Sequence, residues 1–260
     1  MRRVIAFPCK GETLIGTLDP AAGHAGLLIV SGGNEPRMGA HRGMALLAAR
    51  LADQGWPVFR YDRRGVGDSS GDNGGWASSA PDLAAAAAAF HHEQPQLTKS
   101  IGFGNCDAAT TLALFGEAAG IDALILANPW VVEPAGDLPP AAAIRARYLD
   151  RLRSPASWLR GFDLRKALAG LRTLAAPAPA RPLAHRFTDA VNGREATVIL
   201  AKSDATAIAY ADAMRRLGVD HPPIEIDTAS HSFARPEDTI ALEQAIVAAL
   251  NRYSAASASS

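Results

Sequence analysis

Short hydrophobic runs alternate with longer helical patterns along most of the chain. Eight runs predict β-strands, at residues 3–8, 13–18, 26–31, 57–61, 100–103, 123–127, 196–201 and 224–227. Four of the six later runs are rich in Val, Ile and Leu without polar alternation, which is typical of strands covered on both faces. The two early runs are less apolar and lie close together in sequence, so we expect them to form an antiparallel edge.

Helical patterns fill the intervals between these strands. They predict helices at residues 41–54, 82–92, 106–118, 206–218 and 236–253. Gly55 and Gly218 follow two of these helices, at positions where helix-ending glycines are common. Because alternating strands and helices build βαβ units, we expect an α/β fold with a mainly parallel sheet of about eight strands and helices on both faces.

The segment from about residue 129 to residue 190 interrupts this alternation. It contains eight prolines and short amphipathic stretches, at 144–153 and 158–168, with no strand pattern. Ten of its residues are basic and five are acidic. We interpret it as a helical lid inserted after the sixth strand of a single domain that spans residues 1–260.

Composition narrows the classes of protein that fit. Lys plus Arg and Asp plus Glu each number 26, so no net charge attracts nucleic acid or an anionic membrane. The first apolar run is too short for a signal peptide, and none approaches the roughly 20 residues of a transmembrane helix. The two cysteines, Cys9 and Cys106, suggest neither a metal site nor a disulfide framework. We expect a cytoplasmic protein with no nucleic-acid partner, no transmembrane segment, no metal and no organic cofactor.

The most specific chemical feature is the run Gly102-Phe-Gly104-Asn-Cys106-Asp-Ala108, in which an apolar strand leads directly into a helix. A nucleophile on such a turn has strained backbone, so small residues are needed two before and two after it. Gly104 and Ala108 meet this requirement, and cysteine stands where the usual motif has serine. The helix N-terminus favours a thiolate at Cys106, although Asp107 opposes this effect.

Two other interpretations of this run are open. Cys106 could be an ordinary buried cysteine, which is the commonest state of a lone thiol. The two glycines could also begin a dinucleotide-binding loop, but Asp107 occupies the position of the third small residue and the motif lies in mid-chain.

Candidates for an acid and a base follow in the order that this strand-turn-helix arrangement requires. Asp204 comes directly after the strand at 196–201, and His231 follows the last strand. Asp204 could instead be a helix N-cap, and His231 a plain loop histidine. Asp227 is the rival acid, but we favour Asp204 because its loop leaves the carboxyl end of a strand, where open α/β sheets place their sites.

Acyl-transfer chemistry also needs N–H donors for a developing oxyanion. One candidate is the backbone N–H of Asp107. The second should come from the loop Ser31-Gly-Gly33-Asn34, because paired glycines let the main chain approach a ligand closely. The sequence does not choose between Gly33 and Asn34.

These residues resemble a known group. The run Asp62-Arg-Arg-Gly-Val-Gly-Asp-Ser69 is similar to a loop common among α/β hydrolases. The pair Gly32-Gly33, the run Arg37-Met-Gly-Ala-His41-Arg42 and the Cys-Asp elbow are together similar to the first of two hydrolase families associated with the exosortase A system. The resemblance implies an α/β-hydrolase fold and a setting near bacterial exopolysaccharide loci.

Arg37, His41 and Arg42 follow the predicted oxyanion loop and could reach the mouth of the site. They would then bind a carboxylate or phosphate of the substrate, because arginine offers a two-pronged contact. The alternative is that the arginines are solvated or pair with Asp62, Asp68 or Glu35.

The hypothesis from sequence is hydrolysis of a small-molecule ester, thioester or lactone, which could be anionic, through an acyl-enzyme at Cys106. Two alternatives keep the fold. The same three residues could serve an acyltransferase, or the basic lid could bind an anionic polymer, lipid carrier or protein without catalysis.

Overall fold

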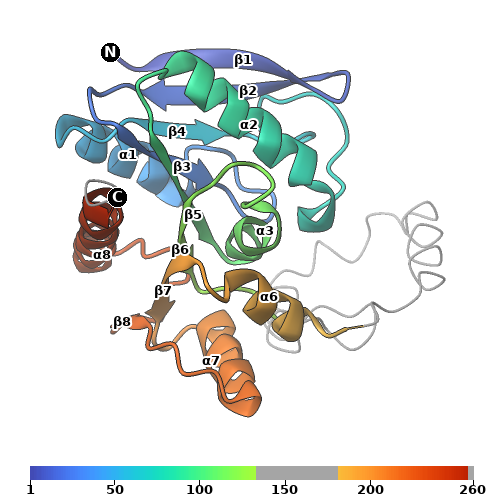
Figure 1. Ribbon diagram of the computed structural model, residues 1–260, viewed down its shortest axis with the longest axis vertical. Helices are drawn as coiled ribbons and strands as arrows, with labels where there is room; N and C mark the ends of the chain where they lie inside the picture. The colour runs from blue at the N-terminus through green and yellow to red at the C-terminus, as the bar shows by residue number, and fades with distance from the viewer. Residues whose placement is uncertain (133–180, 257–260) are drawn as a thin grey trace, which may run out of the picture. The chain divides into compact units, whose positions relative to one another are not determined.

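The computed structural model describes residues 1–132 and 181–256, and its centre is one eight-stranded sheet (Figure 1). The strand order is β1-β2-β4-β3-β5-β6-β7-β8. The strands are β1 Arg3–Cys9, β2 Glu12–Asp19, β3 Ala25–Val30, β4 Val58–Tyr61, β5 Lys99–Asn105, β6 Ala123–Ala127, β7 Glu195–Ala201 and β8 Ile224–Ile226. β2 is antiparallel to β1 and to β4, and all other pairs are parallel. The predicted fold class and the antiparallel edge are therefore confirmed.

The register brings the carboxyl ends of the central strands to one edge of the sheet. Asn105 at the end of β5 is paired with Ala127 at the end of β6, and Ala127 is paired with Ile199 of β7. Residues that directly follow these strands must therefore lie close together, which is where open α/β sheets bind their ligands.

Helices cover both faces of the sheet (Figure 1). Their bounds are α1 Gly43–Asp53, α2 Ala80–Glu93, α3 Asp107–Phe115, α6 Leu183–Val191, α7 Ala205–Leu217 and α8 Pro236–Ala256, with short 3₁₀ turns η1 Ala40–Arg42 and η2 Trp76–Ser78. One core cluster contains residues of α2, α3, α6 and α7, and the other contains residues of α1 and α8. The sheet strands contribute to both clusters, so the central strands are buried on both faces as their sequences predict.

Two predicted helix starts are wrong for the same physical reason. The helix predicted from residue 41 begins at Gly43, because His41 and Arg42 have positive φ of 51° and 63°. The helix predicted from residue 106 begins at Asp107, because Cys106 has φ 62°. Positive φ is incompatible with a right-handed helix, and only the folded context shows where the chain adopts it.

The predicted lid falls mostly outside the described residues, as do its two predicted helical stretches at 144–153 and 158–168. Contacts divide the chain into two units, one formed by Met1–Val131 with Ala184–Ser260 and the other by Val132–Leu183. The described part of the predicted lid contains helix α6, which the sequence analysis did not predict as a separate helix.

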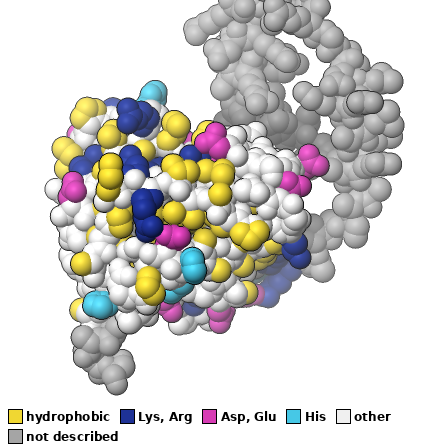
Figure 2. Space-filling model, turned by 90° about the horizontal axis from the view of Figure 1, so that it is seen from above, with side chains coloured by type: hydrophobic (Ala, Val, Ile, Leu, Met, Phe, Trp, Pro, Cys, Tyr) yellow, Lys and Arg dark blue, Asp and Glu magenta, His cyan; other side chains and the backbone are white. Residues whose placement is uncertain are grey.

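The surface seen from above in Figure 1 carries basic and acidic side chains interspersed among hydrophobic ones (Figure 2). This mixture agrees with the balanced charge of the whole sequence. Within the described ranges, no helix is long and apolar enough to cross a membrane.

Candidate active site

Cys106 occupies a sharp turn between the end of β5 and the start of α3. Its backbone has φ 62° and ψ −125°, a conformation that side-chain-bearing residues rarely adopt, and its side chain is half-buried. Backbone hydrogen bonds hold the turn, because the Cys106 N–H donates to Ala127 O at 3.0 Å and Cys106 O accepts from Trp130 N–H at 3.2 Å. Such strain costs about 1–3 kcal/mol and persists only where the surroundings fix it.

Close contact between β5 and α3 explains the small residues that flank this turn. A Cβ at Gly104 would lie 2.7 Å from the carbonyl carbon of Ala108 and 2.8 Å from its oxygen. Ala108 is itself fully buried. The two positions where the sequence predicted small side chains are therefore the positions where strand and helix backbones meet.

The structure brings His231 and Asp204 to the same edge of the sheet as Cys106. The Nδ1 atom of His231 lies 3.0 Å from Oδ2 of Asp204. The Cys106 side chain lies close enough to the imidazole to raise the pKa of His231. The three residues predicted as nucleophile, base and acid thus form one connected chain of side chains.

Hydrogen bonds set the charge states of this chain. The bond to Asp204 and then the bond to Cys106 raise the pKa of His231 to about 10, against the opposite effect of burial. Burial alone would raise the pKa of Asp204, but hydrogen bonds from His231 and from the backbone N–H groups of Ala207 and Thr206 bring it below its ordinary value.

Asp204 is also the N-cap of α7. Its Oδ2 accepts from Thr206 N–H at 3.0 Å and from Ala207 N–H at 3.1 Å. The N-cap interpretation and the His231 pairing are therefore both realised in one side chain. The rival acid, Asp227, is exposed to solvent.

The predicted oxyanion loop lies against the start of α3. The N–H of Gly33 donates to Asp107 Oδ1 at 2.7 Å, and the Asp107 side chain is buried. A Cβ at Gly32 would lie 2.5 Å from this same oxygen and 2.8 Å from the backbone oxygen of Asn105, so a side chain there would force this loop or the end of β5 to move. The Gly33 N–H is thus engaged within the protein, whereas Asn34 is exposed and uses its side-chain Oδ1 to accept from Asn73 Nδ2 at 2.7 Å.

Arg37 does not project freely toward the site. Its guanidinium pairs with the buried carboxylate of Asp62, and its Nη1 lies 2.9 Å from Oδ2 of Asp68. The alternative of an internal ion pair is therefore what the structure shows for this arginine. His41 and Arg42 are exposed on the strained turn before α1.

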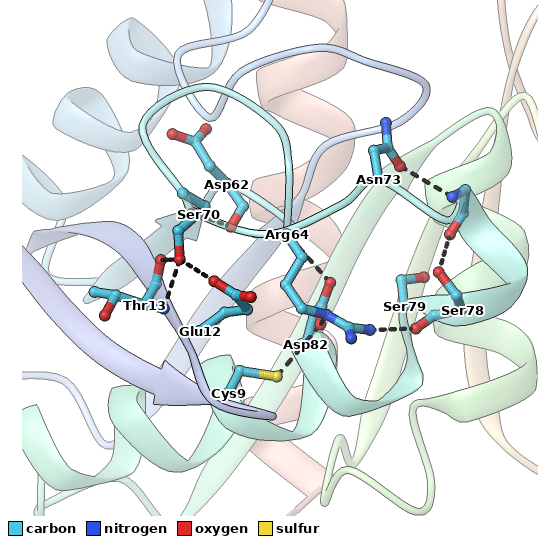
Figure 3. A network of polar contacts seen from close by, with 12 residues as sticks. Cys9, Glu12, Thr13, Asp62, Arg64, Ser70, Asn73, Ser78, Ser79 and Asp82 are labelled. Carbon is cyan, nitrogen blue, oxygen red and sulfur yellow. Dashed lines mark hydrogen bonds and ion pairs between the residues drawn. The ribbon is translucent and has the colours of Figure 1, made fainter. Parts of the chain in front are cut away.

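Cys9 provides a contrast with Cys106. Figure 3 shows its thiol pointing at Asp82, whose Oδ1 accepts from Cys9 Sγ at 3.3 Å and from Arg64 Nε at 2.5 Å. Burial first, and then the hydrogen bond to Asp82, raise the pKa of the Cys9 thiol to about 11. Cys9 is therefore held as an unreactive thiol at neutral pH.

Sequence reasoning missed two groups beside Cys106. Asn105 and Asn128 hydrogen-bond to each other and to the backbone of His231. The indoles of Trp76 and Trp130 meet edge to face with centroids 6.4 Å apart, and the backbone N–H of Trp130 donates to Cys106 O. An asparagine after a strand normally indicates a turn, so only the neighbouring strands reveal this arrangement.

Among the described residues, no three His, Cys, Asp or Glu side chains are arranged to hold a metal ion.

Solved structures share this fold along nearly the whole chain. The α/β hydrolase GrgF from Penicillium sp. sh18 superposes with a TM-score of 0.64 at 18% identity, covering 97% of this chain and 98% of that one. The esterase Pf2001 from Pyrococcus furiosus gives 0.68 at 14% identity, covering 97% and 91%. The thioesterase domain from the curacin biosynthetic pathway gives 0.59 at 14% identity, covering 95% and 99%. The fold is therefore that of the α/β hydrolases.

A family model narrows this class. Residues 24–187 match the model described as serine aminopeptidase, S33, so the chain belongs to this family of α/β hydrolases. The matched range includes Cys106 but ends before Asp204 and His231. No curated protein sequence gave a match.

Proposed function

We propose that this chain is a hydrolase that forms an acyl-enzyme on Cys106, with His231 as its acid-base group and Asp204 as the residue that orients His231. The observation that carries the proposal is the connected chain from the strained Cys106 through His231 to Asp204. This arrangement combines a nucleophile, a base within hydrogen-bonding reach and a carboxylate that orients the base.

The reaction proceeds in two balanced steps. The Cys106 thiolate attacks the substrate carbonyl carbon, an S–C bond forms, and the C–O or C–S bond to the leaving group breaks while His231 gives that group a proton. Water then attacks the thioester as His231 takes one of its protons, and the S–C bond breaks to release the carboxylic acid. Asp204 keeps its charge throughout and stabilises the imidazolium.

Two backbone N–H groups are the proposed donors to the oxyanion. The first is that of Asp107, because the opening residues of a helix have N–H groups without intrahelical acceptors. The second is that of Asn34, since the Gly33 N–H already donates to the Asp107 carboxylate. Both groups belong to segments that are held together by the hydrogen bond from the Gly33 N–H to the Asp107 carboxylate.

Esters, thioesters and lactones are the proposed substrate class. The expulsion of an amine from a tetrahedral intermediate competes poorly with return of a thiolate, whereas an alcohol or thiol leaves more readily. The names of two structural neighbours, an esterase and a thioesterase domain, agree with this class. The family description instead names a serine aminopeptidase, and cysteine in place of serine is the reason that we favour esters over amides. A link to exosortase or exopolysaccharide systems is a proposal from the sequence resemblance alone.

Substitution of each cysteine tests the assignment. We expect Cys106→Ala to lower kcat for a panel of p-nitrophenyl esters and acyl thioesters by about 10³-fold or more, as removal of a catalytic nucleophile does. Cys9→Ser is the matched control and should keep the wild-type rate, because Cys9 lies in the separate network with Asp82. Wild-type turnover in Cys106→Ala would refute the proposal.

Intact-mass spectrometry gives a second readout. An acyl thioester probe should add one acyl group to the wild type and to Cys9→Ser, and none to Cys106→Ala. Acylation of Cys106→Ala to the wild-type extent would mean that another residue is the nucleophile.

A further inference from the structure

A fully buried asparagine joins the ends of three strands at the candidate site. The Oδ1 atom of Asn128 accepts from Ala201 N–H, at the end of β7, at 2.8 Å. Its Nδ2 atom donates to Asn105 Oδ1, at the end of β5, at 3.1 Å, and to the carbonyl oxygen of His231 at 3.2 Å. Its side-chain oxygen and nitrogen are therefore both satisfied by groups of the site region.

Asn105 provides a second contact to the same carbonyl. Its Nδ2 atom donates to His231 O at 2.9 Å, and it directly precedes Cys106 in the chain. The His231 carbonyl thus accepts from two side-chain amides, one at the end of β5 and one directly after β6. Two donors fix a carbonyl in direction as well as in position, which a single donor does not.

The backbone of Asn128 is held in an unusual conformation. Its φ is 39°, in the left-handed region that asparagine tolerates better than most residues, and its N–H donates to Ile199 O at 2.9 Å. The preceding residue, Ala127, accepts from the Cys106 N–H. The segment Ala127-Asn128 therefore hydrogen-bonds to the Cys106 turn, to β7, which precedes Asp204, and to the loop that carries His231.

We propose that Asn105 and Asn128 are positioning residues that set the place of His231 between Cys106 and Asp204. This inference rests on the proposed function, because positioning matters only if His231 exchanges protons with Cys106. Neither asparagine needs to contact the substrate. They act through the His231 backbone, and a displacement of about 1 Å at a catalytic group can cost about 10²-fold in rate.

Two substitutions test the inference. Asn105→Ala removes one donor to the His231 carbonyl at a half-buried position, so this variant should fold. Asn128→Gly removes the other amide while glycine still accepts the positive φ. We expect each to lower kcat for p-nitrophenyl esters by about 10-fold to 100-fold with KM little changed. Because they share one network, the double variant should lose less than the product of the two single effects.

The pH dependence of Cys106 alkylation separates positioning from mere stability. If His231 moves away, the thiolate loses its partner, so iodoacetamide labelling near neutral pH should fall relative to labelling at about pH 9. Thr197→Val is the matched control, because it removes a buried hydrogen bond with Tyr253 from the other end of β7. It should lower Tm while leaving kcat and the alkylation profile at wild-type values.

The outcomes distinguish this inference from the proposed function. Variants that lose Tm like Thr197→Val but keep kcat and the alkylation profile would overturn the positioning role. If Cys106→Ala retains turnover, the proposed function fails by itself, and the alkylation profiles of the asparagine variants still report whether the pair positions His231 against the thiol.

Discussion

At the scale of single residues, the charge of His231 affects how the neighbouring Cys106 thiol can react. With a pKa raised to about 10, His231 holds its proton at neutral pH. A protonated imidazole cannot accept a proton, but it can stabilise a thiolate that has already lost one. Under the proposed function, attack by a thiolate does not require His231 to accept a proton, whereas attack by the serine that the family description names would require it.

The charge of His231 predicts the outcome of Cys106→Ser. A serine hydroxyl must give its proton to His231 as it attacks, and general-base help of this kind contributes about 10²-fold to 10⁴-fold. We expect kcat near neutral pH to fall by about 10²-fold or more, with part of the loss recovered as pH rises and His231 loses its proton. A pH series with a p-nitrophenyl ester checks this, and a serine variant as active as wild type at neutral pH would contradict it.

Asp204 predicts a separation of stability from activity. Asp204→Asn keeps a side-chain oxygen for the N–H groups of Thr206 and Ala207, so Tm should change little. It removes the charge beside His231, so kcat should fall by about 10³-fold or more. Asp204→Ala should lose activity and also about 1 kcal/mol of unfolding free energy, because the cap is lost. Equal stability of the two variants would argue against the capping role.

At the scale of secondary-structure elements, the sequence predicted the strands well because their apolar runs are short and bounded by polar turns. The strand at 123–127 matches β6, and the other bounds differ by at most two residues. The order of Cys106, Asp204 and His231 along these elements made all three candidates, and the structure places His231 Nδ1 3.0 Å from Asp204 Oδ2. The sequence did not predict the role of Asn128 or the hydrogen bond from the Gly33 N–H to Asp107. Both depend on contacts between segments that are distant in sequence.

The close contact between β5 and α3 predicts the effect of a larger residue at position 104. Gly104→Ala places a Cβ against the Ala108 carbonyl at less than van der Waals contact, so the helix must move away from the strand. We expect a loss of about 1–3 kcal/mol in unfolding free energy and a large loss of activity, because α3 carries the Asp107 N–H. The measurement is urea unfolding together with ester turnover.

Gly43→Ala is the control for this substitution. Gly43 has φ −56° at the start of α1, and a Cβ added there would meet no atom within 4 Å, so alanine should be neutral or stabilise the fold by up to about 1 kcal/mol. If both alanine variants destabilise equally, contact with Ala108 is not the reason that position 104 requires glycine.

At the scale of the whole molecule, balanced charge means that no general field governs stability. The formal net charge is zero at pH 7 with histidines neutral, and both signs are mixed on the face in Figure 2. Individual titrating groups should therefore contribute measurably to the dependence of stability on pH. We expect the clearest contribution from His231, because its pKa in the folded chain lies far above its ordinary value of 6.5.

The sign of this dependence follows from proton binding. Between about pH 6.5 and pH 10, the folded chain keeps the His231 proton while the unfolded chain has lost it, so stability must fall as pH rises. Its contribution is complete below about pH 6.5 and lost above about pH 10. Since the His231 side chain is 40% exposed, solvent screening reduces the size of the effect but not its direction.

Comparison of the wild type with His231→Gln isolates this contribution, because every other titrating side chain is common to both. We expect the wild type to have the higher Tm below about pH 6.5, and the difference between the two to shrink steadily toward pH 10. Thermal unfolding followed by circular dichroism across this range measures it. A difference that stayed constant or grew with pH would mean that the folded chain does not hold a proton on His231, and the proposed attack by a Cys106 thiolate would lose its electrostatic basis.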